Sequence, residues 1–497
     1  MSSGGASSGH VFPGARVGED DPRYSTLVRG FNLRWVGRPR YVEVCGDTDQ
    51  VVRAVQRALD DGLRITARGG GHCYEDFVSG NDGGVILDLS PMNGVYLDEA
   101  TGCHCIEGGA TLWNAYVALY KDYDVTIPGG SCASVGAGGH VTGGGYGLLS
   151  RLHGLTIDFL EAVEIVVVDD SGTARAITVS RDSQDADERL LLWASRGGGG
   201  GNFGIVTRFL FRDLPPAPSR AYILSHAWDW SALDQATFAR LIANYGEFLK
   251  ANSAVGSPYS GLFSMLHLNQ RAGECPQIVL AAQYVGDEPA LLDEFESAIE
   301  AGLPSPTGQV APAGYLGVIA RNPDVRELPW LYATQTMNGT GANRRGKYKS
   351  AYMIEPFPDY QVQVMWTFLS EPTSPNPAAL LQVDSYGCQV NALEPDATAI
   401  PQRSSIMKLQ YQTYWTDPAQ DDENLSWIRD FYVAMYGPRG PVPDGTVDGC
   451  YVNYPDVDLP DWQHLYYKGN YPELQRAKGR WDPGNVFNHR QSVEPPG

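Results

Sequence analysis

One glycine-rich segment, Thr126–Gly147, constrains the fold of this chain more than any other feature. Nine of its 22 residues are glycine, and larger side chains such as Cys132, His140 and Tyr146 are interleaved among them. Flexible linkers combine glycine with serine and lack such residues. Glycine lets backbone amides approach a ligand closely and adopt positive φ, so loops of this kind wrap a phosphate or a flat cofactor. We therefore expect a cofactor-binding loop here.

A second glycine-rich loop, RGGGHCYEDF, begins at Arg68 and presents His72, 60 residues before Cys132. Each loop displays one nucleophilic side chain with little competing bulk, which predicts one large ligand held at two points. Neither loop is a Walker A motif, because Lys and Ser/Thr do not follow the last glycine. Neither is a Rossmann fingerprint, because no G-x-G-x-x-G opens a helix directly after a strand with an acid some twenty residues on.

Other chemistries have weaker support in the sequence. Taken singly, a histidine in a glycine loop is more often a hydrogen-bonding residue, and a lone cysteine is more often inert packing. The runs Cys103–Cys105 and His72–Cys73 lack a CxxC pair, an HExxH motif or zinc-site spacing, so we predict no metal. No G-x-S-x-G elbow indicates a serine hydrolase.

Length and charge narrow the class of protein. A chain of 497 residues is expected to split into two or three lobes with a cleft between them. Its 58 acidic and 37 basic residues give a net charge of −21, which disfavours nucleic acid and anionic membranes as partners. No signal peptide or membrane-spanning run is visible, so we expect a cytoplasmic protein. Eight cysteines are too sparse for a disulfide scaffold.

Composition divides the chain into four parts. Residues 1–33 form a flexible N-terminal segment. Residues 34–214 alternate short β-branched runs with amphipathic helices, as in a mixed α/β lobe. Residues 215–441 combine long amphipathic helices with alternating runs, as expected for helices laid on one face of an antiparallel sheet. Residues 442–497 are too few to fold alone and are expected to return to the first lobe beside the glycine loops.

Hydrophobic periodicity predicts individual elements within these parts. A helix capped by Thr48 is expected to end at Gly62, and another is expected over residues 111–120. Further helices are predicted at 237–251 and 290–302. Strands are predicted at 41–45, 64–67, 85–89, 161–170, 276–286 and 361–370, and a further strand is expected to follow the five glycines at 197–201.

Four blocks in this order carry a resemblance to a known family: RGGGHCYEDF, PGGSCASVGAGGHVTGGGYGLLSR, GGGGGNFGIVT, and YVNYPD with YYKGNYPELQRAKGRWDPGNVF. The chain resembles the bicovalent flavoprotein oxidases of the berberine-bridge-enzyme group, from about Arg34 to Ser492, and most of all the actinomycete antibiotic-tailoring oxidases. This implies the α+β vanillyl-alcohol-oxidase/p-cresol-methylhydroxylase-type fold. In that fold an FAD-binding domain (34–214) is joined to a substrate domain (215–441) whose antiparallel sheet is backed by helices.

The resemblance implies FAD as a doubly attached cofactor. His72 would bond the 8α-methyl group of the flavin, and Cys132 would bond the neighbouring ring carbon as a thioether. A neutral imidazole and a readily formed thiolate among backbone amides suit these roles. Cys73 is the competitor for Cys132, and family spacing leaves it as packing.

The resemblance also implies contacts with the rest of FAD, for which backbone amides are well suited. The pyrophosphate would lie against Gly69–Gly71 and Ser134–Gly139, and the adenine and ribitol along Gly144, Gly204 and Val206. The full set of implied cofactor contacts is Arg68, Gly69, Gly70, Gly71, His72, Cys73, Gly129, Gly130, Cys132, Ser134, Val135, Gly136, Gly138, Gly139, His140, Gly143, Gly144, Gly145, Gly201, Asn202, Gly204, Val206, Tyr451 and Asn453.

The activity implied by the resemblance is oxidation of an alcohol on a sugar-bearing or polyketide-type natural product, with dioxygen reduced to hydrogen peroxide. The base would be Tyr454, with Tyr451 and Tyr146 close to substrate or flavin. A phenol with a pKa near 10 needs its anion stabilised to act at neutral pH. Without the family, simple packing of the two neighbouring tyrosines is favoured.

Trp366, Tyr352 and Tyr386 are candidate stacking residues for a large substrate, and core packing explains them equally well. Three other functions stay open: an oxidative cyclase of the same fold, an oligosaccharide oxidase, and a non-enzymatic small-molecule or polysaccharide-binding protein. A homo-oligomer is compatible with the sequence.

Overall fold

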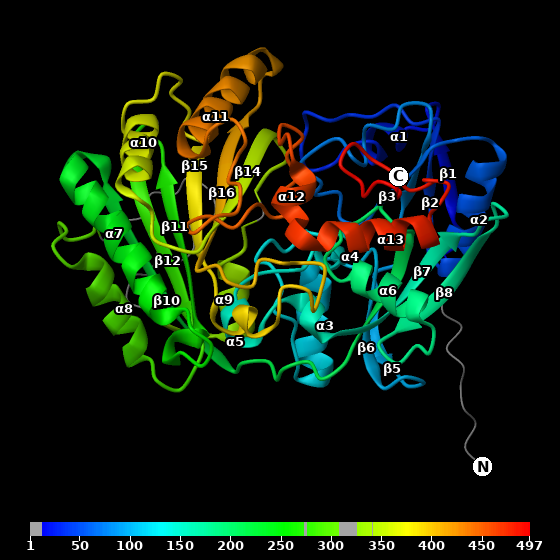
Figure 1. The fold of residues 1–497 in the computed structure, drawn as a ribbon, viewed down its shortest axis with the longest axis horizontal. Coiled ribbons are helices and arrows are strands. Elements are labelled where there is room, and N and C mark those ends of the chain that lie inside the picture. The colour runs from blue at the N-terminus through cyan, green and yellow to red at the C-terminus, as the bar shows by residue number, and fades with distance from the viewer. Residues whose placement is uncertain (1–11, 273–275, 308–325, 340) are drawn as a thin grey trace.

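The structure is a computed structural model that describes residues 12–272, 276–307, 326–339 and 341–497. Within these residues the strands form three β-sheets. The largest sheet and its helices occupy one half of the molecule, and the two smaller sheets occupy the other half (Figure 1).

The first small sheet holds the strand that leads into the His72 loop. Its strands run in the order β1-β2-β4-β3, with β2, β4 and β3 parallel and β1 antiparallel. The helix after β2 begins one residue earlier than predicted, because the Asp47 side chain, rather than Thr48, caps it by accepting from the Gln50 N–H. The elements are β1 (Ala15–Gly18), α1 (Tyr24–Leu27), β2 (Tyr41–Val44), α2 (Thr48–Asp60), β3 (Ile65–Arg68) and β4 (Val85–Asp88).

The second small sheet is fully antiparallel, in the order β5-β6-β9-β7-β8. Strand β7, which lies between β9 and β8, is buried along almost its whole length, as its run of β-branched residues predicts. The Cys132 loop leaves helix α3 and passes through the short helix α4. The elements are β5 (Val95–Asp98), β6 (Cys103–Glu107), α3 (Leu112–Tyr123), α4 (Ala137–Thr142), α5 (Ser150–His153), β7 (Leu160–Val168), β8 (Ala174–Ser180), α6 (Ala186–Ser195) and β9 (Ile205–Phe211).

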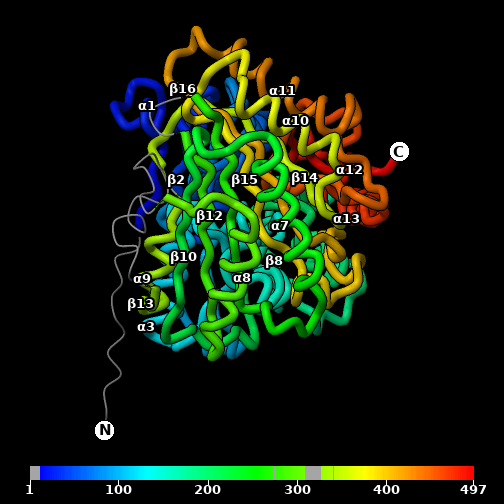
Figure 2. Tube along the Cα trace, turned by 90° about the vertical axis from the view of Figure 1, so that its left-hand side faces the viewer, coloured from blue at the N-terminus to red at the C-terminus, as the bar shows by residue number. Residues whose placement is uncertain are grey.

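The third sheet has seven antiparallel strands in the order β13-β10-β12-β11-β15-β16-β14. Helices α7, α8, α10 and α11 cover its outer face, which leaves the other face toward the glycine loops (Figures 1 and 2). The elements are β10 (Arg220–Asp229), α7 (Gln235–Asn252), β11 (Leu262–Asn269), β12 (Gln277–Tyr284), α8 (Ala290–Glu300), β13 (Glu327–Pro329), α9 (Trp330–Thr336), β14 (Arg345–Met353), α10 (Asp359–Ser370), β15 (Ala379–Ser385), β16 (Met407–Trp415) and α11 (Asp421–Tyr436).

The prediction of a strand at 361–370 is wrong, because this segment is helix α10. The alternation of valines with polar residues resembles a strand. However, Gln361, Met365 and Leu369 are buried and four residues apart, which is the spacing of one helical face. Packing against α7 and α11 favours the 3.6-residue period of a helix over the two-residue period of a strand.

The C-terminal segment contains α12 (Trp462–Tyr467) and α13 (Tyr471–Trp481) and lies on the half with the two small sheets (Figure 1). The fully buried Lys478 ammonium donates to the Asn202 carbonyl at 2.7 Å and pairs with Asp482 at 2.6 Å. Asn453 donates to the His140 carbonyl at 3.0 Å. The Lys478–Asn202 bond ties α13 to the residue that follows the glycines at 197–201, and the Asn453 bond holds the YVNYPD motif beside the Cys132 loop. The exact division of the chain into four parts stays a prediction.

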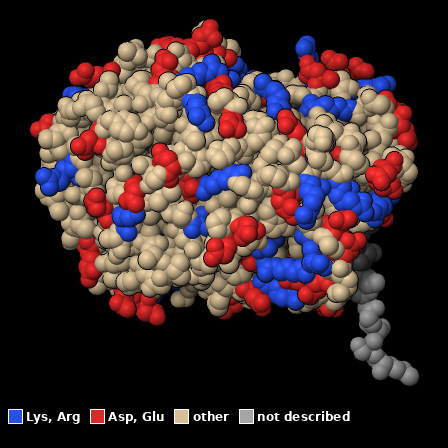
Figure 3. Space-filling view, in the orientation of Figure 1, with Lys and Arg blue, Asp and Glu red and all other residues tan. Residues whose placement is uncertain are grey.

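Charged side chains are scattered over the visible face, and Lys and Arg gather over α6 and α13 (Figure 3). Acidic side chains lie among them, so this face carries no continuous basic stripe. Among the described residues, none of the helices combines the length and apolar character that a membrane span requires.

Candidate active site

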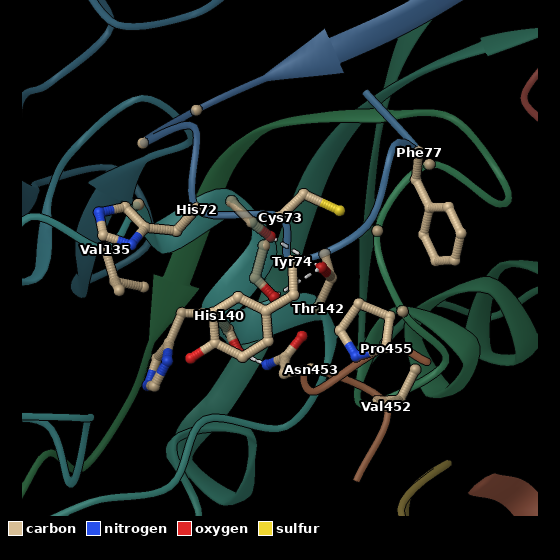
Figure 4. A pocket seen from close by; sticks show the side chains of 18 of the residues that line it. His72, Cys73, Tyr74, Phe77, Val135, His140, Thr142, Val452, Asn453 and Pro455 are labelled. Carbon is tan, nitrogen blue, oxygen red and sulfur yellow. Dashed lines mark hydrogen bonds between the residues drawn. The ribbon is translucent and has the colours of Figure 1, made fainter. Parts of the chain in front are cut away.

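A cavity of about 340 Å³ lies between the glycine loops, the inner face of the large sheet and the YVNYPD motif. Figure 4 shows His72, Cys73 and Tyr74 from one loop facing His140 and Thr142 from the other, with Asn453 from the C-terminal motif closing the side. Segments more than 300 residues apart in the chain therefore contribute to one site.

The two glycine loops touch backbone to backbone. A Cβ atom on Gly70 would lie 2.3 Å from the Gly136 nitrogen and 2.8 Å from the Ser134 carbonyl oxygen, and one on Gly136 would lie 2.2 Å from the Gly70 nitrogen. These distances are shorter than the contacts that Cβ atoms make in proteins, and the neighbouring atoms are backbone, so both positions require glycine. This close approach brings His72 and Cys132 to the same cavity.

The His72 imidazole is fixed on two sides. It stacks on Phe31 with ring centroids 4.5 Å apart, and its Nε2 lies 2.8 Å from the Ser134 Oγ. Burial lowers the pKa of His72 to about 4, so the ring is neutral at physiological pH. This agrees with the neutral nucleophile expected from the sequence.

The Cys132 thiol differs from the expectation of a readily formed thiolate. Burial raises its pKa to about 11, even though the Lys408 charge and the Gly339 N–H both act to lower it. Burial also raises the pKa of Cys73 to about 12. Both thiols line the cavity, so the geometry keeps Cys73 as a competitor.

Tyr146, Tyr451 and Tyr454 all line the cavity, and their hydroxyls have different partners. Tyr146 donates to the Ser385 carbonyl, and Tyr451 accepts from the Asn453 amide at 3.2 Å. Tyr454 accepts from the Lys408 ammonium at 2.8 Å. Burial raises the pKa of all three phenols.

Lys408 is a site residue that sequence reasoning missed. Its side chain is 2 % exposed, and its ammonium pairs with Asp384 at 2.9 Å and lies over the Tyr454 ring at 4.3 Å. Lys408 and Asp384 are directly opposed on β16 and β15. One signal was present: in MKLQYQTYW every second residue from Lys408 to Tyr414 is polar or phenolic, which marks one face of a strand.

Most of the residues implied by the resemblance line the cavity: Arg68, Gly69, Gly70, Gly71, His72, Cys73, Gly130, Cys132, Val135, Gly136, Gly138, Gly139, His140, Gly201, Asn202, Gly204, Val206, Tyr451 and Asn453. Lining residues that sequence reasoning did not name include Phe31, Tyr74, Phe77, Phe263, Met265, Gln382, Asp384, Lys408, Tyr414 and His489.

Five implied contacts do not line the cavity: Gly129, Ser134, Gly143, Gly144 and Gly145. Most are glycine for packing reasons. A Cβ on Gly143 would lie 2.0 Å from the Asn453 side chain, and one on Gly145 would lie 2.4 Å from the Thr156 hydroxyl. The Ser134 side chain bonds to His72 instead.

The three aromatic residues expected to stack on substrate do not line the cavity either. Trp366 belongs to α10 on the outer face of the sheet and packs on Trp230 and Phe238. Tyr352 and Tyr386 are fully buried behind Tyr451 and Tyr146. The structure therefore shows all three as core residues, which is the alternative that the sequence left open.

The lining residues fit a flat, phosphate-bearing cofactor. Three glycine stretches, at 69–71, 136–139 and 199–201, bring backbone to the cavity wall with almost no side-chain bulk. Two nucleophiles, His72 and Cys132, open onto the same space. One ring system lying between them could react with both.

Comparisons with known proteins agree with this geometry. Residues 39–177 match the FAD binding domain model, and residues 450–494 match the berberine and berberine-like model. The aclacinomycin-N/aclacinomycin-A oxidase of Streptomyces galilaeus is 44% identical over 97% of this chain and 90% of its own length.

Solved structures are similar over nearly the whole chain. A flavoenzyme involved in shunt product recycling in caerulomycin biosynthesis is 40% identical, with a TM-score of 0.90 over 97% of this chain and 99% of its own. A glycopeptide hexose oxidase complexed with teicoplanin is 36% identical, with a TM-score of 0.89 and the same coverage. The expected α+β fold is thereby confirmed, and this chain belongs to the berberine-bridge-enzyme-like FAD-linked oxidoreductases.

Proposed function

We propose that this enzyme oxidises an alcohol of a sugar-bearing or polyketide-type natural product, with dioxygen as the final electron acceptor. The names of its relatives support the substrate class: one is an aclacinomycin oxidase, and another is a glycopeptide hexose oxidase complexed with teicoplanin. When bound, FAD accepts a hydride from an alcohol carbon and passes the electrons to dioxygen, which yields hydrogen peroxide.

Tyr454 is the base in this proposal. Its oxygen accepts a hydrogen bond from an ammonium, whereas Tyr146 and Tyr451 bond to neutral groups. A nearby cation stabilises a phenolate and so opposes the effect of burial. The Lys408–Tyr454 bond of 2.8 Å is the observation that carries this assignment.

Lys408 and Asp384 together control the proton on Tyr454. Asp384 lies on the far side of the ammonium at 2.9 Å and raises the pKa of Tyr454. The Tyr454 phenolate would take the proton of the substrate hydroxyl. The Lys408 ammonium would stabilise the negative charge of that phenolate before the transfer. The strand register that opposes Asp384 and Lys408 is thus part of the catalytic arrangement.

The inner face of the large sheet offers hydrogen-bonding groups to a polyhydroxylated substrate. Gln382 lines the cavity and donates to Asp384 at 2.7 Å. Gln410 donates to the Tyr74 hydroxyl at 2.9 Å, next to the cavity wall. Amide and phenol groups can bond sugar hydroxyls, and the apolar Phe263 and Met265 beside them suit a ring face.

His72 and Cys132 are the covalent attachment points in this proposal, because both open onto the cavity from rigid loops. Acid precipitation of the purified protein is expected to leave the yellow colour in the pellet. His72→Ala and Cys132→Ala should each keep covalent flavin, and the double variant should release it. Colour in the supernatant of the unaltered protein would refute covalent attachment.

The oxidase reaction is tested separately by oxygen electrode with alcohol-bearing natural products. We expect hydrogen peroxide in equal amount to the carbonyl product formed. A cyclised product, identified by NMR, would contradict alcohol oxidation while leaving the flavin assignment intact.

A further inference from the structure

The Ser134 side chain contacts the His72 imidazole. Its Oγ lies 2.8 Å from the His72 Nε2, although Ser134 itself does not line the cavity wall. The two residues belong to different glycine loops, 62 positions apart. This contact therefore joins the loop that carries His72 to the loop that carries Cys132.

The backbone on either side of Ser134 is anchored. The Ala133 and Val135 carbonyls accept from the first N–H groups of helix α3, those of Trp113 at 3.1 Å and Leu112 at 2.9 Å. The Ala133 N–H donates to the Asn338 side chain at 2.9 Å. Ser134 is thus a fixed hydrogen-bonding point for the ring rather than a mobile one.

The His72 ring is equally constrained. Phe31 stacks on it, and the Phe31 N–H donates to the Gly71 carbonyl at 2.8 Å, just before the histidine. A neutral imidazole carries its single proton on either Nδ1 or Nε2. If Ser134 donated to Nε2, the proton would sit on Nδ1 and the Nε2 lone pair would be engaged. If Nε2–H donates to Ser134, Nδ1 keeps a free lone pair.

We propose that Ser134 is a positioning residue: its hydroxyl accepts the Nε2–H of His72 and so holds the imidazole in the tautomer that keeps Nδ1 unprotonated and free to bond the flavin. This inference rests on the proposed histidyl attachment. Only this tautomer combines the observed contact with a free nucleophilic nitrogen.

The bonding step balances with dioxygen as oxidant. A C–N bond forms between Nδ1 and the methyl carbon, one methyl C–H bond breaks, and the imidazole loses its Nε2 proton. The two electrons released remain in the flavin ring until dioxygen takes them with two protons, which gives hydrogen peroxide. Ser134 accepts a hydrogen bond from Nε2 while positive charge builds up on the imidazole.

The test uses the Cys132→Ala protein, in which only His72 can hold flavin covalently. FAD is added to flavin-free protein in air, and covalent flavin is followed by fluorescence of the denatured protein on a gel. We expect Ser134→Ala to slow incorporation about tenfold, as the loss of one hydrogen bond to a charged group would do. Ser134→Thr keeps the hydroxyl and should restore the rate.

Two controls separate positioning from general damage to the loop. Ser171→Ala removes an exposed hydroxyl that bonds Asp169 outside the glycine loops, and its incorporation rate at His72 should match that of the Cys132→Ala protein. In the His72→Ala protein, Ser134→Ala should leave attachment at Cys132 at the same rate.

Equal incorporation with and without the Ser134 hydroxyl would overturn the inference, as would equal slowing at both attachment points. If the Cys132→Ala protein takes up no covalent flavin at all, the histidyl linkage fails and the inference falls with it. A peptide digest showing the flavin on Nε2 would also contradict the assignment.

Discussion

Lys408 and Tyr454 show how one residue can change the role of another. Burial raises the pKa of Tyr454 well above its ordinary value, and the Asp384 charge raises it further. In the proposed mechanism the Lys408 ammonium, 2.8 Å from the Tyr454 oxygen, opposes this by stabilising the phenolate. Since a base must be unprotonated, kcat/KM should rise with pH until Tyr454 has lost its proton.

Two substitutions should move that pH profile in opposite directions. Lys408→Met removes the stabilising cation, so the rising limb should shift to higher pH and kcat/KM at pH 7 should fall about tenfold or more. Asp384→Asn removes the carboxylate that raises the pKa of Tyr454, so the limb should shift to lower pH. The measurement is kcat/KM from pH 6 to pH 10 on protein with full flavin content.

Tyr454→Phe is the reference for both variants, and it should abolish the rising limb. A pH profile unchanged in Lys408→Met, or shifted the same way in both variants, would rule out this account of the base.

At the scale of elements, strand β14 connects the large sheet to the two segments that carry His72 and Tyr454. Lys347 and Lys349 project from one face of this strand, two residues apart, as the strand period requires. Lys347 pairs with Glu75 at 2.5 Å and Asp456 at 2.7 Å, and Lys349 pairs with Asp456 at 2.7 Å. Glu75 follows the His72 loop, and Asp456 follows Tyr454. The large sheet thus holds both loops through buried charges.

Removing Lys347 should therefore be costly. Lys347→Met would leave the buried Glu75 carboxylate without its ammonium partner and Asp456 with Lys349 alone, and we expect a loss of about 3–5 kcal/mol in the free energy of unfolding. The matched control is Lys250→Met, which breaks the half-exposed pair with Glu355 and should cost less than about 1 kcal/mol. Urea unfolding of both variants checks this, and similar losses would show that the buried cluster contributes no special stability.

At the scale of the whole molecule, buried neutral histidines make stability depend on pH. Burial is the largest cause in each case, and it lowers the pKa to about 4 for His72, His140, His153 and His267 and to about 3 for His489. In the unfolded chain these rings take up protons near pH 6.5, while the folded protein does not. The unfolded state binds more protons between these values, so stability is lost as pH falls through this window.

We expect the free energy of unfolding to decrease steadily from pH 7 to pH 5, where most carboxylates are still ionised. Each fully buried histidine contributes up to about 1.4 kcal/mol per pH unit. His267→Gln should reduce the pH dependence of the free energy of unfolding by up to about 1.4 kcal/mol per pH unit. His464→Gln, at an exposed position, should leave this pH dependence unchanged. Urea midpoints measured at half-unit pH intervals provide the test, and a flat profile would be inconsistent with it.

Local patterns were sufficient for much of the fold. Helical spacing in α2, α3, α7 and α8 and β-branched runs in β4, β7 and β12 predict those elements, because burial of one face acts over a few residues. The segment 361–370 shows the limit, since alternating valines satisfy a strand pattern while Met365 and Leu369 pack as a helix. Packing against the neighbouring helices α7 and α11 determines that this segment is a helix, and these contacts cannot be read from the local sequence.

Sequence alone determined which loops bear the two nucleophiles, because glycine runs around His72 and Cys132 allow close backbone approach to a ligand and the order of these motifs matches a family. Only the tertiary structure decided what surrounds them. Lys408 reaches Tyr454 through the register of β15 against β16, and Ser134 reaches His72 because Gly70 and Gly136 meet without side chains. Such contacts depend on how segments far apart in the chain pack against one another. The spacing of residues along the sequence does not specify the distances between these segments.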